Sequence, residues 1–370
     1  MNKKLKIAII GSRGYPYVYS GYETLVKELS ERLIDKGVDV RVYCHSSLFE
    51  KKPKYLNGIE LIYTPSIETK FLSQIVNSFF SFIHVCFSNI DVVFVVNSAN
   101  GPFGILTKIF GKRTCINVDG LEWLRPKWKG LGSIYFKFSS KLATVLYDEI
   151  ISDSDHMSMI YEKKFNRKSK TIAYGSTIVK TESKDFLDEL NLKTNDFYLI
   201  IGRLVPDNNS KLIIEGFLKS KSSKKIVIVG DVPYNDNYAN QVKKMADKNV
   251  IFTGYIKSQY KLSQLYRNCY CYVHGHEFGG TNPTMVNALD LNCEIIALDT
   301  IFNREMTERK EIIFFKKNIN SLMKSIIFFE NNKQYYVNKN KGYYIGEKYE
   351  WDYIVTKYLE LFLKLKVKKI

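Results

Sequence analysis

Short apolar runs alternate with helix-length segments along the chain, and this alternation limits the possible folds more than any other feature. The run at 6–10 (KIAII) ends at Gly11, the segment 22–36 has leucines at helical spacing, and Gly37 separates it from a second apolar run, VDVRVYC. Further strand candidates are IELIYT, DVVFVVN, RTCINVD and EIISDS, the last of which leads into a helix from His156. Strands joined by helices run parallel, so the pattern predicts a doubly wound α/β sheet.

The same pattern begins again in the second half. After the polar stretch 181–196, strand candidates recur in FYLIIGRL, KKIVIVGD, NVIFTGYI, CYCYVHG and EIIALD, with a helix at about residues 210–219. The sequence therefore predicts two Rossmann-like domains, residues 1–180 and 181–350. The last helix, at 351–370, follows a loop rich in Asn, Lys and Tyr and packs back on one of the two halves, the N-terminal domain being one option.

The net charge of +17 calls for a partner, because basic surfaces attract nucleic acid, anionic lipid or phosphorylated substrates. The sequence has no zinc-finger spacing, RNP-like aromatic strand or long Lys/Arg run, which argues against nucleic acid. The tail LELFLKLKVKKI alternates leucine-type residues with Lys364, Lys366, Lys368 and Lys369. This tail predicts either a helix at the edge of an anionic bilayer or a solvated helix end.

Two segments bear on where the chain resides. The stretch 71–87 is aromatic and almost uncharged, but Gln74, Asn77 and His84 interrupt it, and it falls short of the ~20 apolar residues of a membrane span. We expect a buried or membrane-facing amphipathic helix there. The N-terminal apolar run stops at Gly11, too early for a signal peptide, and the six cysteines form no C-x-x-C pair, so we expect a cytoplasmic protein with reduced thiols.

Ligands of doubly wound sheets bind where strands end, so the loops that follow strands are the candidate sites. The first of them, GSRGYPYVYSGYET, carries Gly11, Gly14 and Gly21. An NAD-binding fingerprint also needs an acidic residue at the end of the next strand, and that strand ends in YCH at residues 43–45. The glycines thus predict a turn that approaches a phosphate or a sugar, with a purely conformational role as the alternative.

Two clusters have metal-like spacing. Asp153 and Asp155 form an Asp-x-Asp pair where a strand gives way to a helix, a place where Ser and Asp are ordinary N-caps. His274 and His276 lie on one face of a strand, without an evident third ligand. We therefore expect helix capping at the first cluster and no metal at either.

An arginine and a glycine turn precede helices of the second half. Arg203 follows a buried strand in GRLVPDNN, with a helix just beyond, a position that suits an anion at a helix N-terminus. The alternative role of Arg203 is an interdomain salt bridge. The turn GGTNP also precedes a helix, and its glycines let a ligand approach backbone amides. Together these features predict a diphosphate-binding clamp.

Five strings, GSRGYP...SGYET, VDGLEWLRPKW, GRLVPDNN, HGHEFGGTNP and IFNRE, resemble those of the retaining GT-B glycosyltransferases of glycosyltransferase family 4. More narrowly, they resemble the rhamnosyltransferase-like members of bacterial polysaccharide assembly. The resemblance runs over nearly the whole chain. It implies a GT-B architecture with an acceptor side in the N-terminal Rossmann-like domain and a nucleotide-sugar donor side in the C-terminal one. It also implies no cofactor and no required metal.

The resemblance assigns the donor side residue by residue. Arg203 matches the diphosphate-binding arginine, while the lysine usual five positions later is Asn208 here. The glutamate that commonly holds the donor ribose falls on Asn287. Its paired glutamate falls on Gly279, and the available carboxylate nearby is Glu277. The other donor-binding residues that the resemblance implies are Gly14, Asn209, Gly280, Thr281 and Asn282.

Catalytic and acceptor-side roles follow from the same resemblance. Glu277 and His276 flank the transferred sugar, and Arg203 stabilises the departing diphosphate. Asp119 of VDGLEW is a base or an acceptor-orienting carboxylate. The implied acceptor-side residues are Tyr22, Glu23, Glu122, Trp123 and Arg125.

The expected function is transfer of a sugar with retention, from dTDP-rhamnose or a UDP-sugar, onto a saccharide or lipid-linked acceptor in capsule, exopolysaccharide or cell-wall polysaccharide synthesis. Such an enzyme works in the cytoplasm, in peripheral contact with the inner face of an anionic membrane. Two other functions stay open: a sugar-nucleotide epimerase of the same architecture, and a catalytically weakened membrane-associated homologue. The second is motivated by Asn208 and Asn287, which each replace a charged residue of the family's pattern.

Overall fold

The computed structural model describes residues 4–16, 20–67, 69, 72–125, 128, 130–232 and 235–367. The chain forms two compact units. Unit 1 consists of Met1–Tyr174 together with Lys348–Ile370, and unit 2 consists of Gly175–Glu347. The chain thus leaves unit 1 a few residues before position 180 and returns to it at its end.

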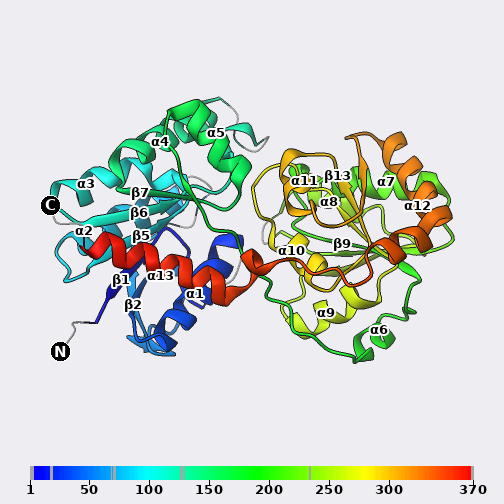
Figure 1. The fold of residues 1–370 in the computed structure, drawn as a ribbon, viewed down its shortest axis with the longest axis horizontal. Helices are drawn as coiled ribbons and strands as arrows, with labels where there is room; N and C mark the ends of the chain where they lie inside the picture. Colours follow the sequence, from blue (N-terminus) through cyan, green and yellow to red (C-terminus); the bar gives the residue numbers. More distant parts are fainter. Residues whose placement is uncertain are drawn as a thin grey trace. The chain divides into compact units, whose positions relative to one another are not determined.

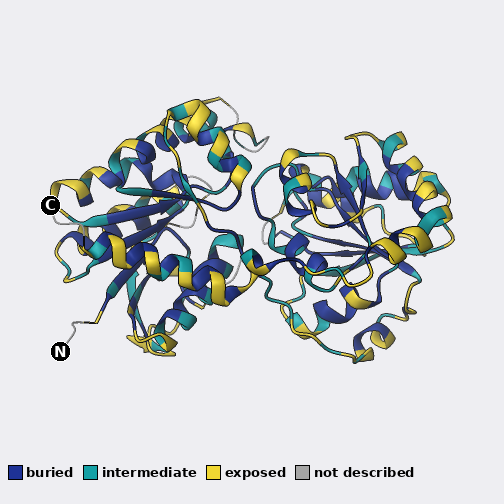
Figure 2. Ribbon diagram, viewed as in Figure 1, coloured by how far each residue is buried: buried dark blue, intermediate teal, exposed yellow. Residues whose placement is uncertain are grey.

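Unit 1 is built on an eight-stranded sheet in the order β3-β4-β2-β1-β5-β6-β7-β8. The strands are β1 (Lys6–Ile10), β2 (Asp39–His45), β3 (Tyr55–Leu56), β4 (Ile59–Thr64), β5 (Val92–Val96), β6 (Arg113–Asn117), β7 (Glu149–Ser152) and β8 (Lys170–Thr171). Neighbouring strands run parallel, except that β3 and β4 pair antiparallel. The central strands β1 and β5 are buried (Figure 2), which is why their sequences are continuous apolar runs. The predicted parallel α/β sheet is confirmed.

Helices cover both faces of this sheet (Figure 1). They are α1 (Gly21–Asp35), α2 (Leu72–Cys86), α3 (Gly104–Ile109), α4 (Leu131–Leu146), α5 (Asp155–Phe165) and α13 (Trp351–Val367). α1 and α13 pack on one face, where Leu29, Tyr358 and Phe362 join a core with alternate residues of β1, β2 and β5. α2, α3 and α4 lie on the other face (Figure 1), as right-handed crossovers from β4 to β5, β6 and β7 require.

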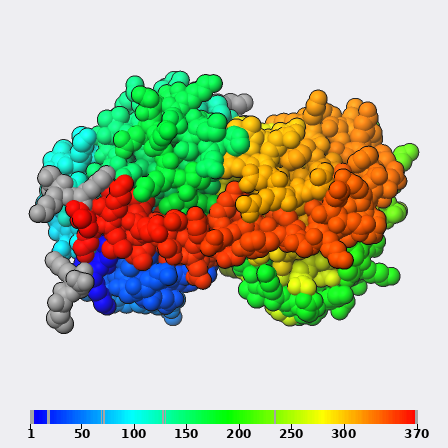
Figure 3. Space-filling model, in the orientation of Figure 1, coloured from blue at the N-terminus to red at the C-terminus, as the bar shows by residue number. Residues whose placement is uncertain are grey.

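The closing helix α13 belongs to unit 1 and lies at its surface, red in Figure 3. The leucine-type residues of its last turns that face the core are Leu361, Phe362 and Leu365. Lys364 forms an ion pair with Glu149 at 3.7 Å, and Lys366 forms one with Asp91 at 3.0 Å. The apolar face that the bilayer prediction assumed for this tail is therefore largely used inside unit 1. Residues 368–369 lie outside the described residues.

Unit 2 is built on six parallel strands in the order β11-β10-β9-β12-β13-β14. The strands are β9 (Phe197–Ile201), β10 (Lys225–Val229), β11 (Val250–Gly254), β12 (Cys271–His274), β13 (Ile295–Leu298) and β14 (Ile313–Phe315). The helices are α6 (Asp185–Glu189), α7 (Ser210–Ser220), α8 (Asn237–Lys243), α9 (Gln259–Asn268), α10 (Pro283–Asp290), α11 (Ile301–Met306) and α12 (Ile319–Lys339). The predicted second parallel domain is confirmed.

One element of unit 2 differs from the prediction. Most of the stretch rich in Asn, Lys and Tyr is not a loop but the second half of α12. Phe329 and Tyr336 are buried in the core of unit 2, and their burial holds a helix whose exposed positions carry the polar residues. Tertiary packing thus outweighs the loop-like composition.

Two further expectations concern membranes and thiols. None of the helices in the described part of the chain is long and apolar enough to cross a membrane. The aromatic stretch 71–87 contains α2, which buries four polar residues together with Phe82, Val85 and Cys86. All six cysteines are buried and outside any disulfide, as expected for structural thiols.

Candidate functional site

The loops after β9 and β12 come together at the carboxyl edge of the unit 2 sheet, because these two strands are neighbours. Three hydrogen bonds join them. The Asn209 amide donates to the Gly275 carbonyl at 2.8 Å and to Glu277 Oε1 at 3.1 Å. The Glu277 backbone N–H donates to the Asp207 carbonyl at 3.1 Å. The two loops predicted to bind the donor are thus one structure, with Asn209 as a link.

Close packing of these loops depends on Gly275. A Cβ atom there would lie 2.5 Å from the Asn208 carbonyl oxygen. Asn208 itself is buried and donates from its amide to the Arg203 carbonyl at 2.8 Å. At the position where the resemblance has a lysine, the chain therefore places an uncharged group that holds the backbone of Arg203.

Glu277 has a cationic partner that the sequence analysis did not identify. Lys317 forms an ion pair with Glu277 Oε1, the same oxygen that accepts from Asn209. The Glu277 side chain is nearly buried, whereas that of Lys317 is about half exposed. Lys317 follows β14, so its place directly after a strand is the signal that would have found it. The unit 2 loops thus combine one carboxylate with a flexible ammonium group.

The two histidines of β12 and its following loop form a stacked pair. The ring centroids of His274 and His276 are 4.5 Å apart, at an interplanar angle of 18°. His274 is buried, and the Tyr272 hydroxyl lies 3.0 Å from its Nδ1. Burial, and then the charge of His276, lower the pKa of His274 well below its usual value, so its ring is neutral at pH 7. The role of His276 beside a sugar stays a prediction.

The GGTNP turn is built as a helix N-terminus. Asn282 caps α10, because its Oδ1 accepts from the Thr284 backbone N–H at 3.0 Å and from Thr284 Oγ1 at 2.8 Å. Pro283 occupies the first turn of the helix, where its missing N–H costs no hydrogen bond. Gly279 has a φ of +112°, a backbone conformation that favours glycine. The helix after the turn is confirmed, and the donor-binding roles of residues 279–282 stay predictions.

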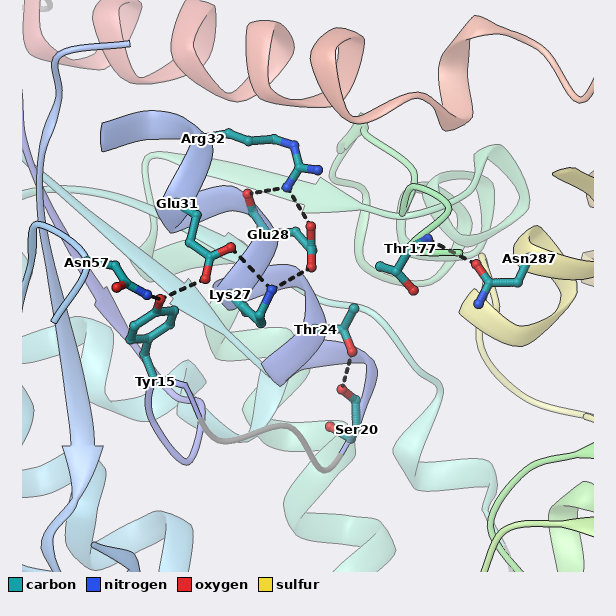
Figure 4. Close-up of polar contacts among 10 residues, drawn as sticks. All are labelled: Tyr15, Ser20, Thr24, Lys27, Glu28, Glu31, Arg32, Asn57, Thr177 and Asn287. Carbon is teal, nitrogen blue, oxygen red and sulfur yellow. Dashed lines mark hydrogen bonds and ion pairs between the residues drawn. The ribbon is translucent and has the colours of Figure 1, made fainter. Parts of the chain in front are cut away.

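Asn287, predicted to contact the donor ribose, is buried on α10. Its Oδ1 accepts hydrogen bonds from the Thr177 backbone N–H at 3.0 Å, drawn in Figure 4, and from Ser176 Oγ at 3.2 Å. The side chain thus ties the first residues of unit 2 to α10. Its carbonyl oxygen is used inside the protein, and a ribose contact through its NH₂ group stays a prediction.

In unit 1, Asp119 follows β6 and lies in a polar cluster. Its N–H donates to Asn117 Oδ1 at 3.0 Å, its carbonyl accepts from the Tyr22 hydroxyl at 2.6 Å, and its Oδ2 accepts from the Tyr174 hydroxyl at 2.8 Å. Burial raises the pKa of Asp119, against the lowering effect of hydrogen bonds with Asp153 and Tyr174. Asp119 and Tyr22, each predicted as a site residue, are therefore in contact, whereas the sequence did not predict that Asn117, Asp153 and Tyr174 lie beside Asp119.

The SDSDH string contains a helix cap, as expected. Ser154 Oγ accepts from the Met157 backbone N–H at 3.1 Å at the start of α5. Asp153 is buried beside Asp119. Within the described ranges of the chain, no group of three or more His, Cys, Asp and Glu side chains is arranged to hold a metal ion.

The other acceptor-side residues of VDGLEWLRPKW contact one another or the core. Arg125 Nε lies 3.0 Å from Glu122 Oε1, and Trp128 Nε1 donates to Glu122 Oε2 at 2.7 Å. Trp123 is buried, and its ring lies 6.0 Å from that of Tyr161. These contacts explain the local structure of the loop, and its binding of an acceptor stays a prediction.

The glycine loop after β1 is held by packing. Glu23 is buried, and its Oε1 accepts from the Arg13 backbone N–H at 3.1 Å. Gly14 has a φ of +120°, and a Cβ atom there would lie 2.8 Å from the Cβ of Cys44. Both observations support the conformational role that the sequence left open for these glycines, and contact of Gly14 with a donor stays a prediction.

Two family models match the chain. Residues 4–177 match a domain of unknown function, DUF1972, and residues 182–344 match "Glycosyl transferases group 1". A curated relative from Campylobacter jejuni, N-acetylgalactosamine-N,N'-diacetylbacillosaminyl-diphospho-undecaprenol 4-alpha-N-acetylgalactosaminyltransferase, is 22% identical over 217 residues. That match covers 57% of this chain and 58% of the relative, so the chain spans little more than half of the relative's length.

Solved structures resemble the whole chain. Sucrose-phosphate synthase from Thermosynechococcus elongatus superposes with a TM-score of 0.83 at 13% identity, over 99% of this chain and 100% of that one. Anabaena HepE in complex with UDP and glucose gives 0.77 at 14% identity, over 97% and 100%. A glycosyltransferase from Rickettsia africae gives 0.74 at 13% identity, over the full length of both. The predicted GT-B fold is confirmed, and residues 182–344, less than half of the chain, match the group 1 glycosyl transferase model.

Proposed function

We propose that the protein transfers a sugar from a nucleoside-diphosphate donor to a saccharide or lipid-linked saccharide acceptor in polysaccharide synthesis. The observation that carries this proposal is the joined pair of loops after β9 and β12, which lies in the domain that matches the group 1 family. The Campylobacter relative is named for transfer to a diphospho-undecaprenol-linked saccharide, which supports the lipid-linked acceptor. Work at the inner face of the membrane is part of the proposal.

The unit 2 loops have the proposed task of stabilising the departing diphosphate. Arg203 offers a planar set of N–H donors, and the N-termini of α7 and α10 offer backbone N–H groups, so charge that develops on the leaving group meets fixed donors. The positive charge that Asn208 lacks comes instead from Lys317, whose ammonium group lies beside Glu277. Such a site needs neither a metal ion nor a cofactor.

Asp119 is the proposed acceptor-side group. A carboxyl group whose pKa is raised accepts a proton more readily than an exposed aspartate, which suits a base or an orienting partner for an acceptor hydroxyl. The hydroxyl groups of Tyr22 and Tyr174 fix its position. Retention of the anomeric configuration is part of the proposal because the resemblance implies it.

The proposed donor is dTDP-rhamnose, as the resemblance implies. UDP-hexoses are the second candidate, because Anabaena HepE has been solved with UDP-glucose and the Campylobacter relative is named for transfer of N-acetylgalactosamine. A donor screen with the purified protein and a lipid-linked saccharide separates them by the mass of the product, and NMR gives its anomeric configuration. A UDP-hexose preferred by about tenfold or more would replace the rhamnosyl assignment. A product with inverted anomeric configuration would rule out retention.

The same screen without an acceptor tests the competing functions. Isomerisation of the nucleotide-sugar in that sample would identify an epimerase, and inactivity with every donor would identify a silent homologue. Arg203→Ala should abolish most transfer, whereas Arg267→Ala, at the surface ion pair with Glu182 in the same unit, should leave it unchanged.

A further inference from the structure

Helix α2 buries a row of polar residues against the sheet and exposes a row of apolar residues to solvent. Its buried polar residues are Ser73, Asn77, Ser78 and Ser81, and its second half also buries Phe82, Val85 and Cys86. Asn77 Nδ2 donates to Thr64 Oγ1 at 2.8 Å, and Ser78 Oγ donates to Asn100 Oδ1 at 2.6 Å, so the polar side is anchored by hydrogen bonds. The exposed apolar residues are Leu72, Ile75, Phe79, Phe80 and Ile83, followed by Phe87. An ordinary surface helix carries polar rather than apolar residues on its solvent side.

Helix α4 has a similar arrangement. It buries Ser139, Ser140 and Thr144 together with Phe136 and Ala143, and Ser139 Oγ donates to the Ser98 carbonyl at 2.6 Å. The exposed apolar residues of α4 are Leu131, Ile134, Phe138 and Val145. Two of the exposed fractions are large, 85% for Leu131 and 64% for Ile134. Two separate helices of unit 1 therefore carry an apolar side that no described part of the unit covers.

Helix α3 connects these two apolar sides. It contacts both α2 and α4, and it exposes Ile105 and Ile109, with Phe110 just after its end. The rings of Phe87 and Phe110 lie 5.0 Å apart, and Lys108 Nζ donates to the Val145 carbonyl at 3.4 Å. Figure 1 shows the three helices in succession on one side of the unit 1 sheet, and α2 and α3 lie in the cyan surface of Figure 3. We name the exposed apolar residues of these helices, with Phe87 and Phe110, the α2–α4 face.

The α2–α4 face is basic as well as apolar. Lys108, Lys137 and Lys141 are exposed on α3 and α4, and none of the three helices contains an Asp or a Glu. Single exposed apolar side chains are ordinary on a protein surface, but a contiguous set on three helices marks an interaction site. The charge then selects the partner, because the lysine stems lie along apolar surface while their ammonium groups reach toward anions.

We propose that the α2–α4 face docks on an anionic lipid bilayer. Phenylalanine, leucine and isoleucine side chains enter the boundary between headgroups and acyl chains, and the lysines pair with lipid phosphates. A second copy of this chain fits less well, since it would bring like charges of both faces together. The docking is a property of unit 1 and does not depend on the sugar-transfer reaction proposed above.

Vesicle binding by the full-length protein tests this proposal. Co-sedimentation is measured with vesicles of phosphatidylcholine alone and with added phosphatidylglycerol, at low and high salt, without donor or acceptor. Lys137→Gln with Lys141→Gln should lower the partition coefficient on anionic vesicles by about twenty-five-fold, at roughly fivefold per lysine. Phe79→Ser with Phe138→Ser should lower it by at least about tenfold. These side chains are exposed, so circular dichroism should show unchanged folds.

A matched control lies on α13, where Leu363→Ser with Lys357→Gln changes an exposed apolar residue and a partly exposed lysine. This variant should bind vesicles as the wild type does. Equal binding of neutral and anionic vesicles, or wild-type binding by both face variants, would overturn the proposal. A wild-type dimer in light scattering that the face variants dissociate, without vesicle binding, would instead identify a self-interface and overturn it as well. Because no sugar substrate is present, either failure is distinct from a failure of the proposed reaction.

Discussion

Replacement of Asn209 tests whether the two loops of the candidate donor site are held as one structure. Asn209→Gly removes the amide that donates to the Gly275 carbonyl and to Glu277, but it keeps the left-handed backbone at φ 58°, which glycine tolerates. The bond to the neutral carbonyl contributes about 1 kcal/mol, and leaving that carbonyl unpaired costs about 1 more. The bond to Glu277 adds little, because Lys317 pairs with the same carboxylate oxygen and keeps it partnered in the variant. We expect a loss of about 2 kcal/mol in the free energy of unfolding of unit 2.

Two matched variants separate the hydrogen bonds from backbone strain. Asn209→Ala removes the same bonds and adds the strain of an alanine in the left-handed region, so it should be destabilised by about 1 kcal/mol more than Asn209→Gly. Asn166→Gly, at the left-handed end of α5 in unit 1, should change the free energy of unfolding by less than about 0.5 kcal/mol.

Urea unfolding followed by two signals distinguishes the units. All three tryptophans, Trp123, Trp128 and Trp351, lie in unit 1, so their fluorescence reports that unit while far-UV circular dichroism reports both. The Asn209 variants should shift the circular dichroism transition to lower urea, leave the tryptophan transition in place and raise KM for the donor. A change below about 0.5 kcal/mol in unit 2 for Asn209→Gly would refute the reasoning from these contacts.

Four further predictions concern other groups. Arg203→Ala should cost about 2 to 4 kcal/mol of transition-state stabilisation in kcat/KM, with a rate insensitive to chelator, and strong inhibition by EDTA would contradict the metal-free site. Lys317→Ala should lower kcat/KM, and Lys317→Arg should largely restore it. Equal kcat/KM of both variants would show that Lys317 is not part of the site. Burial raises the pKa of Asp119 in the folded state, so the folded protein binds more protons than the unfolded one. The free energy of unfolding should therefore fall as the pH rises from the ordinary pKa of 3.8 through the folded pKa. Asp119→Asn should remove that slope in unfolding measured at several pH values, and an unchanged slope would assign it to other groups. Phe362→Ala should destabilise unit 1 by about 3 to 5 kcal/mol in the tryptophan transition, and a small effect would mean that α13 is not part of its core.

Both parallel sheets were predictable from sequence because each buried strand is a short apolar run in the local sequence. KIAII became β1 and FYLII became β9, since a strand covered on both faces is apolar at every position. The helix cap at Ser154 was predictable for the same reason, as a cap is formed within a few residues. By contrast, the composition of the last part of α12 predicted a loop, because the buried positions of Phe329 and Tyr336 depend on the core they join.

The candidate site was predictable only in its position. Strand-end loops pointed to Arg203 and Glu277, since ligands bind at the carboxyl edge of such sheets. The partners of these residues were not predictable: Asn208 holds the Arg203 carbonyl, Lys317 pairs with Glu277, and Asn287 binds the backbone at residue 177. In each of these contacts the path of a loop brings the two groups together. A local sequence pattern does not predict the path of a loop.

Helix α2 shows most directly what the sequence determined and what the tertiary structure determined. The sequence by itself determined that residues 71–87 contain a helix with one polar and one apolar side, because side chains three and four positions apart share a face. Only the tertiary structure decided that Asn77 and Ser78 face inward, since their hydrogen-bond partners Thr64 and Asn100 come from β4 and from the segment after β5. Periodicity is a property of neighbouring residues, whereas burial of one side depends on hydrogen-bond partners that only the folded sheet brings to it.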